Sequence, residues 1–249
     1  MKIAVQFFSV RDKAEKDFAG TVRELKKMGY EGAELAGLYG HSFAEVKNIF
    51  DAEGLEIISA HVTPNDIFSP DLLEGYRSLG LRYLAVQGFG LSSEREAMKN
   101  CTDTLAQLGK ICKEAGIQLL YHNHRYEFDK AGEERLIDIM YRDVPGELLK
   151  SEFDVAWISV CGIDPVSYLR GYNGRCPLVH FKDYSGKFGE DDFSLKSVGS
   201  GVIPLKELLD TCSQIGTEWV IVEQDSPTAG ISSLKCAEMS IEALKKTAL

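Results

Sequence analysis

The sequence predicts an α/β protein that folds as a single (β/α)₈ barrel, or TIM barrel, and three observations support this prediction. Short apolar runs alternate with amphipathic stretches along all 249 residues, as parallel strands alternate with the helices that connect them. Eight such pairs can be counted, and about 31 residues per pair is a usual repeat length for this barrel. The first run leads into Phe7-Phe8-Ser9-Val10 rather than a glycine-rich turn, which argues against an open dinucleotide-binding sheet.

Each expected strand is a short, mostly apolar run bounded by polar or glycine-containing segments. In chain order these runs are Lys2–Phe8, Gly32–Leu35, Leu55–His61, Tyr83–Gln87, Gln118–His124, Leu149–Asp154, Leu178–Lys182 and Trp219–Glu223.

Amphipathic stretches fill the intervals, and glycine marks the ends of three of them. Glycine readily adopts the left-handed conformation that closes a helix, so a glycine at these points predicts where a helix gives way to a strand. The three helices with their closing glycines are Phe18–Met28 with Gly29, Ser42–Glu53 with Gly54, and Ser92–Ala115 with Gly116.

The composition leads us to expect a cytoplasmic enzyme in which residues 1–249 form a single domain. No run approaches the roughly 20 apolar residues of a membrane span, and residues 1–6 lack the layout of a secretion signal. The six cysteines form no CxxC pair, as expected of reduced thiols. A formal charge of −10 would repel a phosphate backbone. We therefore expect a small-molecule carbohydrate substrate, no nucleic-acid or membrane partner, and a chain that acts alone or as a homo-oligomer.

Polar residues end six of the eight apolar runs. The active site of such a barrel lies at the C-terminal ends of its strands, so these residues are the first candidates for chemistry. A lone histidine there is more often a satisfied polar residue, but four of the five histidines gather at this one rim. The strand-end groups are Glu34, His61, His122-Asn123-His124, Asp154, His180-Phe181-Lys182-Asp183 and Glu223-Gln224-Asp225.

The last four runs supply a candidate metal-ligand set, namely His122, Asp154, His180 and Glu223. Two imidazoles and two carboxylates suit Mn²⁺, Co²⁺, Fe²⁺ or Zn²⁺, with Mg²⁺ as a further candidate. His124 lies two residues beyond His122, so both side chains point inward on an extended strand. His122 is nearer the end of the strand proper and is preferred as the ligand, which leaves His124 to contact the substrate.

At these residues the sequence resembles the xylose-isomerase-like barrels, which include sugar-phosphate isomerases, ketose 3-epimerases, inosose dehydratase and, more distantly, endonuclease IV. The resemblance covers nearly the whole chain, and it rests on the order and spacing of its segments. These segments are Tyr30–Leu35, Ser59–His61, Tyr121–Phe128, Phe153–Trp157, Val179–Asp183, Gly199–Ile203 and Val220–Glu223.

The resemblance implies a metal held by the residues that end strands five to eight. The epimerases use Glu, Asp, His and Glu, and three of these four match at Asp154, His180 and Glu223. His122 stands where those enzymes carry a glutamate that is also a base, and inosose dehydratase-like members look similar to this sequence there. Trp157 replaces a histidine that commonly follows the strand-six aspartate. These departures speak against a two-glutamate epimerase.

The expected chemistry is abstraction of a proton beside a sugar carbonyl, through a metal-stabilised enediolate. Glu223 would be ligand and base, and Lys182, Glu127 or Glu34 would move the second proton. Isomerisation or loss of water is favoured over 3-epimerisation, because a metal-bound imidazole at 122 cannot replace the second base. The residues expected to contact the sugar are Glu34, His61, His124 and Trp157.

Three alternatives concern the role of individual groups. Lys182 could form an ordinary ion pair with Asp183, and Glu127 could brace a loop together with Arg125. The amides of Gly199-Ser200-Gly201 could bind a phosphate, although a plain turn is favoured.

Two alternatives concern the protein as a whole. One is a barrel that binds a sugar without turning it over. The more remote one is an endonuclease IV-like nuclease, which would need more metal ligands and a basic groove.

Overall fold

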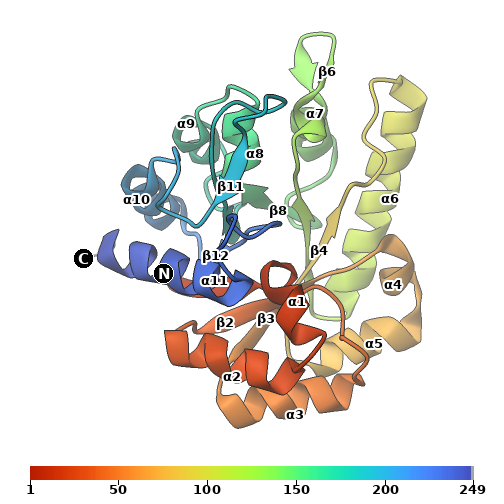
Figure 1. Cartoon of the computed structure of the whole chain (residues 1–249). Helices are drawn as coiled ribbons and strands as arrows, with labels where there is room; N and C mark the ends of the chain where they lie inside the picture. Colours follow the sequence, from red (N-terminus) through yellow and green to blue (C-terminus); the bar gives the residue numbers. More distant parts are fainter. Residues whose placement is uncertain (248–249) are drawn as a thin grey trace.

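Residues 1–247 of the computed structural model form a closed barrel of eight parallel strands surrounded by helices (Figure 1). The closed order β1-β12-β9-β8-β5-β4-β3-β2 confirms the (β/α)₈ fold. The barrel strands are β1 (Lys2–Gln6), β2 (Gly32–Leu35), β3 (Glu56–His61), β4 (Tyr83–Gln87), β5 (Gln118–His122), β8 (Leu149–Asp154), β9 (Leu178–Phe181) and β12 (Trp219–Val222).

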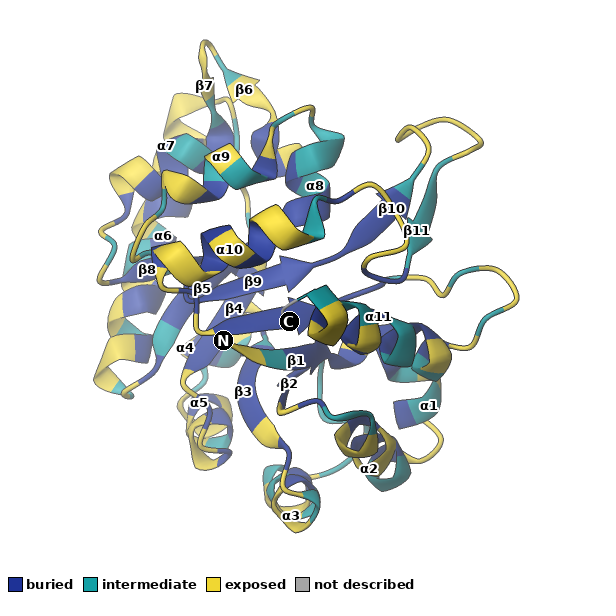
Figure 2. Cartoon of the chain, turned by 90° about the vertical axis from the view of Figure 1, so that its left-hand side faces the viewer, coloured by how far each residue is buried: buried dark blue, intermediate teal, exposed yellow. Residues whose placement is uncertain are grey.

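Helices cover the outside of this barrel and turn their apolar faces toward the strands (Figure 2). No helix within residues 1–247 has both the length and the apolar character needed to cross a bilayer. The helices are α1 (Arg11–Ala14), α2 (Phe18–Met28), α3 (Phe43–Glu53), α4 (Pro64–Phe68), α5 (Pro70–Ser78), α6 (Arg95–Glu114), α7 (Leu136–Asp143), α8 (Val155–Val160), α9 (Pro165–Arg170), α10 (Leu205–Ile215) and α11 (Ser233–Thr247).

The ends of the helices follow from local sequence signals. The Ser42 hydroxyl accepts a hydrogen bond from the Glu45 amide, and the Glu45 carboxylate accepts one from the Ser42 amide. This capping box makes Ser42 the N-cap, so α3 starts one residue later than expected. Gly29 closes α2 with φ +96°, in the left-handed region that glycine occupies without strain. Helix α6 begins at Arg95, and the expected start at Ser92 was wrong by three residues.

Several strands end earlier than the sequence suggested, because side chains take over the hydrogen bonds. The side-chain oxygen of Gln6 accepts from the Phe8 amide and starts a 3₁₀ turn, η1 (Phe7–Val10), so β1 stops at Gln6. Strand β5 stops at His122, and the next residue, Asn123, accepts the Asp154 amide through its side chain at 3.1 Å. The expected ends at Phe8 and His124 were wrong by two residues, and those at Lys182 and Glu223 by one.

Two short hairpins and a second 3₁₀ turn, η2 (Tyr126–Phe128), were not expected. The first hairpin joins β6 (Lys130–Ala131) to β7 (Glu134–Arg135), and the second joins β10 (Asp183–Ser185) to β11 (Ser194–Lys196). Figure 2 shows the β10–β11 hairpin projecting beyond the barrel strands, with an exposed tip.

The barrel interior changes from apolar to polar along the strands. Inward-facing residues alternate with outward-facing ones, so positions i, i+2 and i+4 line the interior. On β12 and just beyond it these are Trp219, Ile221 and Glu223, and on β5 Leu120 is followed by His122. The N-terminal end of the barrel is therefore sealed by apolar side chains, and the polar groups collect at the C-terminal end.

Candidate active site

The four residues predicted as metal ligands come together at the C-terminal end of the barrel. One ligand atom from each of His122, Asp154, His180 and Glu223 can be chosen so that all lie within 4.8 Å of one another, and all four residues are buried. Nδ1 of His180 lies 2.9 Å from Oε2 of Glu223. The four ligands come from neighbouring strands of the barrel, namely β5, β8, β9 and β12. Each ligand lies at or next to the C-terminal end of its strand.

Lys182 lies among the carboxylates beside this set, and not in an ion pair with Asp183. Its Nζ is 3.0 Å from Oδ2 of Asp154, 3.1 Å from Oε2 of Glu223 and 3.1 Å from Oδ2 of Asp225. Burial alone would lower the pKa of the Lys182 ammonium, but these three carboxylates outweigh it and raise the pKa above its usual range. Lys182 is therefore a fixed positive charge in the site.

The protonation states of the four candidate ligands differ. Burial would lower the pKa of His180, but the charges of Glu152, Glu34 and Glu223 outweigh it and raise the pKa well above its ordinary value. Burial would raise the pKa of the Glu223 carboxyl, but the charges of Lys182 and His180 outweigh it, and the pKa falls well below its usual range. Burial lowers the pKa of His122 well below its ordinary value, so its imidazole is neutral. Burial raises the pKa of Asp154 to about 6. A neutral imidazole and an ionised carboxylate are the forms that bind a metal ion.

A second group of buried side chains lies below the candidate ligands, and it includes Glu34, which was predicted to contact the substrate. Glu34 is fully buried, and its carboxylate accepts hydrogen bonds from the side chains of Gln6 and Ser59. Its Oε1 is also 2.7 Å from Nε2 of His180. The structure therefore encloses Glu34 beneath the site. His61, at the end of β3, joins this group and also borders the cavity described next.

A cavity of about 210 Å³ opens above these groups, where a substrate could enter. Pockets for drug-sized ligands measure roughly 300–1,000 Å³, so this cavity suits a molecule with a single ring. Glu223 is the candidate ligand that lines it, and the other three lie buried next to Glu223. The lining residues are Phe8, Ala36, His61, Gln87, His124, Glu223 and Asp225.

Of the other residues predicted to contact a substrate, His124 lines this cavity and Trp157 lies next to it. The ring centroids of His124 and Trp157 are 6.3 Å apart, and Lys182 Nζ lies 5.3 Å from the Trp157 ring. Burial lowers the pKa of His124 to about 4, so this imidazole is neutral near pH 7. A second group of side chains, His61, His122, Glu152 and His180, also has ligand atoms within 4.8 Å of one another, and neither group includes His124, which agrees with the preference for His122.

Glu127, predicted to act from beyond strand five, is not brought to the cavity. Its carboxylate accepts a hydrogen bond from the His124 amide at 2.8 Å and another from the Tyr121 hydroxyl at 3.3 Å. Tyr121 precedes His122 on β5 and therefore points to the opposite side of the sheet. Glu127 fixes the turn after β5, although its partners differ from the Arg125 that we had considered.

The Gly199–Gly201 segment forms a turn whose amides are already engaged. The carboxylate of Asp183 accepts hydrogen bonds from the amides of Gly199, Gly201 and Ile203, at 3.0, 2.8 and 3.1 Å. These donors face an anion that belongs to the chain itself. The turn therefore offers no free set of amides to a phosphate.

Glu152 was missed at the sequence level, and Asp225 was noted at the end of the eighth run but was given no role. Glu152 precedes Asp154 by two residues and Asp225 follows Glu223 by two, so each shares the inward side of its neighbour. The alternation that selected His122 and His124 together could have found both. Asp225 lines the cavity, and Glu152 is fully buried beside His61.

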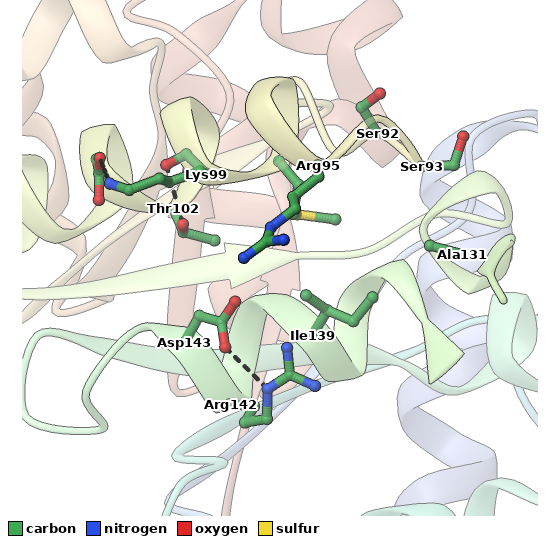
Figure 3. Close-up of a pocket in the computed structure, with 11 residues that line it drawn as sticks. Ser92, Ser93, Arg95, Lys99, Thr102, Ala131, Ile139, Arg142 and Asp143 are labelled. Carbon is green, nitrogen blue, oxygen red and sulfur yellow. Dashed lines mark hydrogen bonds and ion pairs between the residues drawn. The ribbon is translucent and has the colours of Figure 1, made fainter. Parts of the chain in front are cut away.

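A larger hollow, of about 530 Å³, lies outside the barrel between α6 and α7 (Figure 3). Arg95 and Arg142 reach into it from the two helices. Arg142 is paired with Asp143 and Glu134, at 2.8 and 2.6 Å. The hollow contains no histidine and lies away from the strand ends, so we do not place the chemistry there.

The residues at the centre of the barrel fit a divalent metal ion on two grounds. First, His122, Asp154, His180 and Glu223 supply two imidazoles and two carboxylates, a donor set that such ions bind. In addition, the buried carboxylates of Asp154 and Glu223, together with Asp225, face Lys182 as their one amine, so negative charge is in excess. An ion of charge +2 would offset that excess.

Comparison with known proteins gives matches over nearly the whole chain. A family model described as xylose isomerase-like TIM barrel matches residues 22–247. An inosose dehydratase of Clostridium beijerinckii is 23% identical over 255 residues, which cover 86% of this chain and 84% of the relative. The solved structure of a sugar phosphate isomerase/epimerase from Parabacteroides distasonis superposes with a TM-score of 0.86 at 22% identity, covering 100% and 95% of the two chains. The IOLI protein with a binding zinc atom superposes with a TM-score of 0.73 at 18% identity, covering 100% and 96%.

Proposed function

The chain is an enzyme of the xylose isomerase-like TIM barrel family, and from this premise we propose that it is a metal-dependent dehydratase or isomerase of an unphosphorylated keto sugar or keto-cyclitol. We place dehydration of a keto-cyclitol first, since the curated relatives include inosose dehydratases that align with 86% or more of this chain.

The observation that carries the proposal is the position of Glu223 between the cavity and the candidate metal ligands. Its carboxylate lines the cavity and is also within 4.8 Å of ligand atoms of His122, Asp154 and His180. A substrate oxygen in the cavity would thus lie beside both a metal position and a carboxylate base. Deprotonation next to a carbonyl needs this combination.

The ion would be held by His122, Asp154, His180 and Glu223. When bound, it would polarise the substrate carbonyl and stabilise the enediolate formed as the neighbouring C–H loses its proton.

Glu223 is the group placed to accept that proton. It is ionised near neutral pH, because Lys182 and His180 hold its pKa low despite burial, and it faces the cavity. The same carboxylic acid can then return the proton to the adjacent carbon, which gives isomerisation, or to a departing β-hydroxyl, which releases water. One carboxyl group thus serves both steps.

Lys182 would keep its own proton and act on the substrate through its charge. Its ammonium is held by Asp154, Glu223 and Asp225. Burial alone would lower the pKa of Lys182, but these carboxylates outweigh burial and raise it. A permanently charged ammonium stabilises a developing oxyanion without proton transfer. Glu127 and Glu34 would act as positioning residues, since neither reaches the cavity wall.

The arrangement of carboxylates favours a reaction on one face of the substrate. The two acidic residues that line the cavity, Glu223 and Asp225, are two positions apart after β12 and therefore point to the same side. Inversion at one carbon would need a second base, and of the other polar lining residues Gln87 has no basic group, while burial lowers the pKa of His124 to about 4 and makes it a weak base. This supports isomerisation or dehydration over 3-epimerisation.

The absence of a phosphate in the proposed substrate follows from local charge. Asp183 already occupies the amides of Gly199, Gly201 and Ile203, and two carboxylates line the cavity. A phosphate dianion placed there would be repelled by both acids.

The test is to incubate the metal-loaded enzyme with an inosose, fructose, tagatose and a ketose phosphate in deuterated water and to follow the products by NMR. We expect loss of water from the inosose, or deuterium at the carbon next to a carbonyl after isomerisation. Rapid conversion of fructose to its 3-epimer, with deuterium entering only at C3, would overturn the one-base proposal. Tight sugar binding with no exchange of hydrogen would favour a binding protein instead.

A further inference from the structure

Two buried carboxylates lie below the candidate metal ligands, and His61, which borders the cavity, lies between them; we call Glu34, His61 and Glu152 the deep layer. They come from β2, β3 and β8, and Glu34 and Glu152 are fully buried. Two buried carboxylates side by side repel each other strongly unless positive or hydrogen-donating groups lie between them. Nε2 of His61 lies 3.1 Å from Oε1 of Glu34 and 2.9 Å from Oε2 of Glu152, and so joins the two.

The contacts of the Glu34 carboxylate are with side chains of the protein itself, and a substrate could not take their place. Oε1 accepts from Nε2 of Gln6 at 2.7 Å and lies 2.7 Å from Nε2 of His180, while Oε2 accepts from Oγ of Ser59 at 2.5 Å. These partners hold the carboxylate in one orientation. Nε2 of His180 is therefore the nitrogen that carries hydrogen toward Glu34, which leaves Nδ1 to face Glu223 and the metal position.

Glu152 has the corresponding position beneath His122. Its Oε2 lies 3.5 Å from Nδ1 of His122, and its Oε1 lies 3.5 Å from Nε2 of His180. Nδ1 of His122 and Oε1 of Glu152 are buried and have no hydrogen-bond partner within residues 1–247. Nδ1 of His122 faces Oε2 of Glu152 and becomes satisfied when it carries hydrogen toward that oxygen, which leaves the other nitrogen of His122 for a metal ion.

From these contacts we propose that the deep layer selects the metal-binding tautomer of both histidine ligands: Glu34 through Nε2 of His180, and Glu152 through Nδ1 of His122. His61 keeps the two carboxylates together. Glu34 and Glu152 are thus positioning residues. The inference rests on the metal site of the proposed function, and it adds that this site depends on two carboxylates, Glu34 and Glu152, that do not line the cavity.

A metal-bound histidine whose second nitrogen donates to a carboxylate is a stronger and better oriented ligand. Removal of such a carboxylate costs about 10- to 100-fold in metal affinity. Glu152→Gln should weaken metal binding more than Glu34→Gln does, because the new amide can donate to Nδ1 of His122 and so favour the wrong tautomer. Glu34→Gln keeps an acceptor for His180 and can turn its amide toward the Ser59 hydroxyl, so the fold should tolerate it.

The experiment measures Co²⁺ binding to the parent, Glu34→Gln, Glu152→Gln and the ligand variant Asp154→Ala, by competition with a chelator and by the visible absorption of bound Co²⁺. Asp138→Asn is the matched control. Asp138 is a partly buried carboxylate that accepts hydrogen bonds from Tyr168 and Tyr172, on the helical side of the barrel. Thermal unfolding of every variant is recorded in parallel.

We expect Glu34→Gln and Glu152→Gln to bind Co²⁺ about 10- to 100-fold more weakly than the parent, with an altered Co²⁺ spectrum. Asp138→Asn should match the parent in both readouts even where its unfolding temperature falls. Parent-like affinity and spectrum in both glutamine variants would overturn the deep-layer proposal and leave the metal site intact. Failure of the parent itself to bind Co²⁺ would instead overturn the metal-dependent function. Two ions in the parent and one in Glu152→Gln would also overturn it, since the deep layer would then be a metal site itself.

Discussion

At the scale of single residues, the site is defined by four side chains whose partners are all buried. His122, Asp154, His180 and Glu223 come from four adjacent strands, so no local refolding can replace a lost ligand. Loss of one ligand should therefore directly reduce the amount of metal that the protein binds.

We predict that the purified parent carries one divalent transition metal ion per chain, and that Asp154→Ala or His180→Ala removes it. A set of two imidazoles and two carboxylates binds such ions well, whereas three ligands bind them more weakly. Elemental analysis of protein dialysed against metal-free buffer gives the ratio. An unchanged metal content in both variants would show that the ligands have been assigned wrongly.

Glu223→Gln should abolish turnover more completely than it weakens sugar binding. A neutral amide can coordinate weakly and can fill the same space, but it cannot accept a proton. The measurement compares kcat with the dissociation constant for the substrate in the parent and the variant. Activity within tenfold of the parent would remove Glu223 from the role of base.

At the scale of elements, one aspartate fixes the backbone conformation of the segment between β11 and α10. Asp183 gathers three backbone amides from residues 199 to 203, and thereby fixes the loop that follows the β10–β11 hairpin. Gly201 fits closely here, because a Cβ on it would lie 2.2 Å from both Oδ1 of Asp183 and the backbone oxygen of Tyr184.

Gly201→Ala should therefore destabilise the protein, by about 1–3 kcal/mol, because backbone must shift to admit the methyl group. Ser200→Ala is the control, since Ser200 is exposed and its substitution should change stability by less than about 0.5 kcal/mol. Denaturant unfolding monitored by circular dichroism measures both. Equal stability of the two variants would mean that the turn adapts without cost.

The same scale shows which structure the sequence could predict. Three barrel strands, Gly32–Leu35, Tyr83–Gln87 and Leu149–Asp154, have the expected bounds, because apolar runs and turn residues coincide there. Strand ends at Gln6 and His122 were missed because side chains of Gln6 and Asn123, and not the runs themselves, end the pairing. Short runs such as β10 and β11 carry too little periodic signal to be seen.

For the candidate site, the sequence could place residues at a rim but not decide which of them meet. The set of His122, Asp154, His180 and Glu223 follows from counting strand ends, and the structure brings it together. The sequence could not show that Lys182 lies among three carboxylates, that Glu34 is enclosed below them, or that Glu127 turns toward Tyr121. Those facts depend on contacts between residues far apart in the chain.

At the scale of the whole molecule, the candidate ligands join strands from half of the barrel. An ion that binds the folded chain and not the unfolded one adds RT ln(1 + [L]/Kd) to stability, about 2.7 kcal/mol at 100 times Kd. Metal binding should therefore affect global unfolding and not only activity.

We predict that chelation of the metal lowers Tm by about 5–10 °C, since 1 kcal/mol shifts a domain of this size by about 2–4 °C. Differential scanning calorimetry with and without chelator measures the shift. Asp154→Ala serves as the control and should unfold at the same temperature in both conditions. A parent whose Tm is insensitive to chelator would contradict the proposed link between the ion and the fold.

The pairing that closes the barrel has a consequence for how the protein is made. Strand β1 pairs with β12, in the register Lys2 with Trp219 and Val5 with Val222, and the hydroxyl of Tyr30 donates to the Ala237 carbonyl in α11. The ribosome synthesises β1 first, yet that strand's second partner does not exist until residue 219 has been translated. Throughout that interval the nascent chain presents an unpaired edge of Lys2–Gln6, and unpaired edges recruit other strands. Chaperones that shield such edges during translation should therefore matter more for the yield of this protein than for a chain whose first strand has both of its partners early in the sequence.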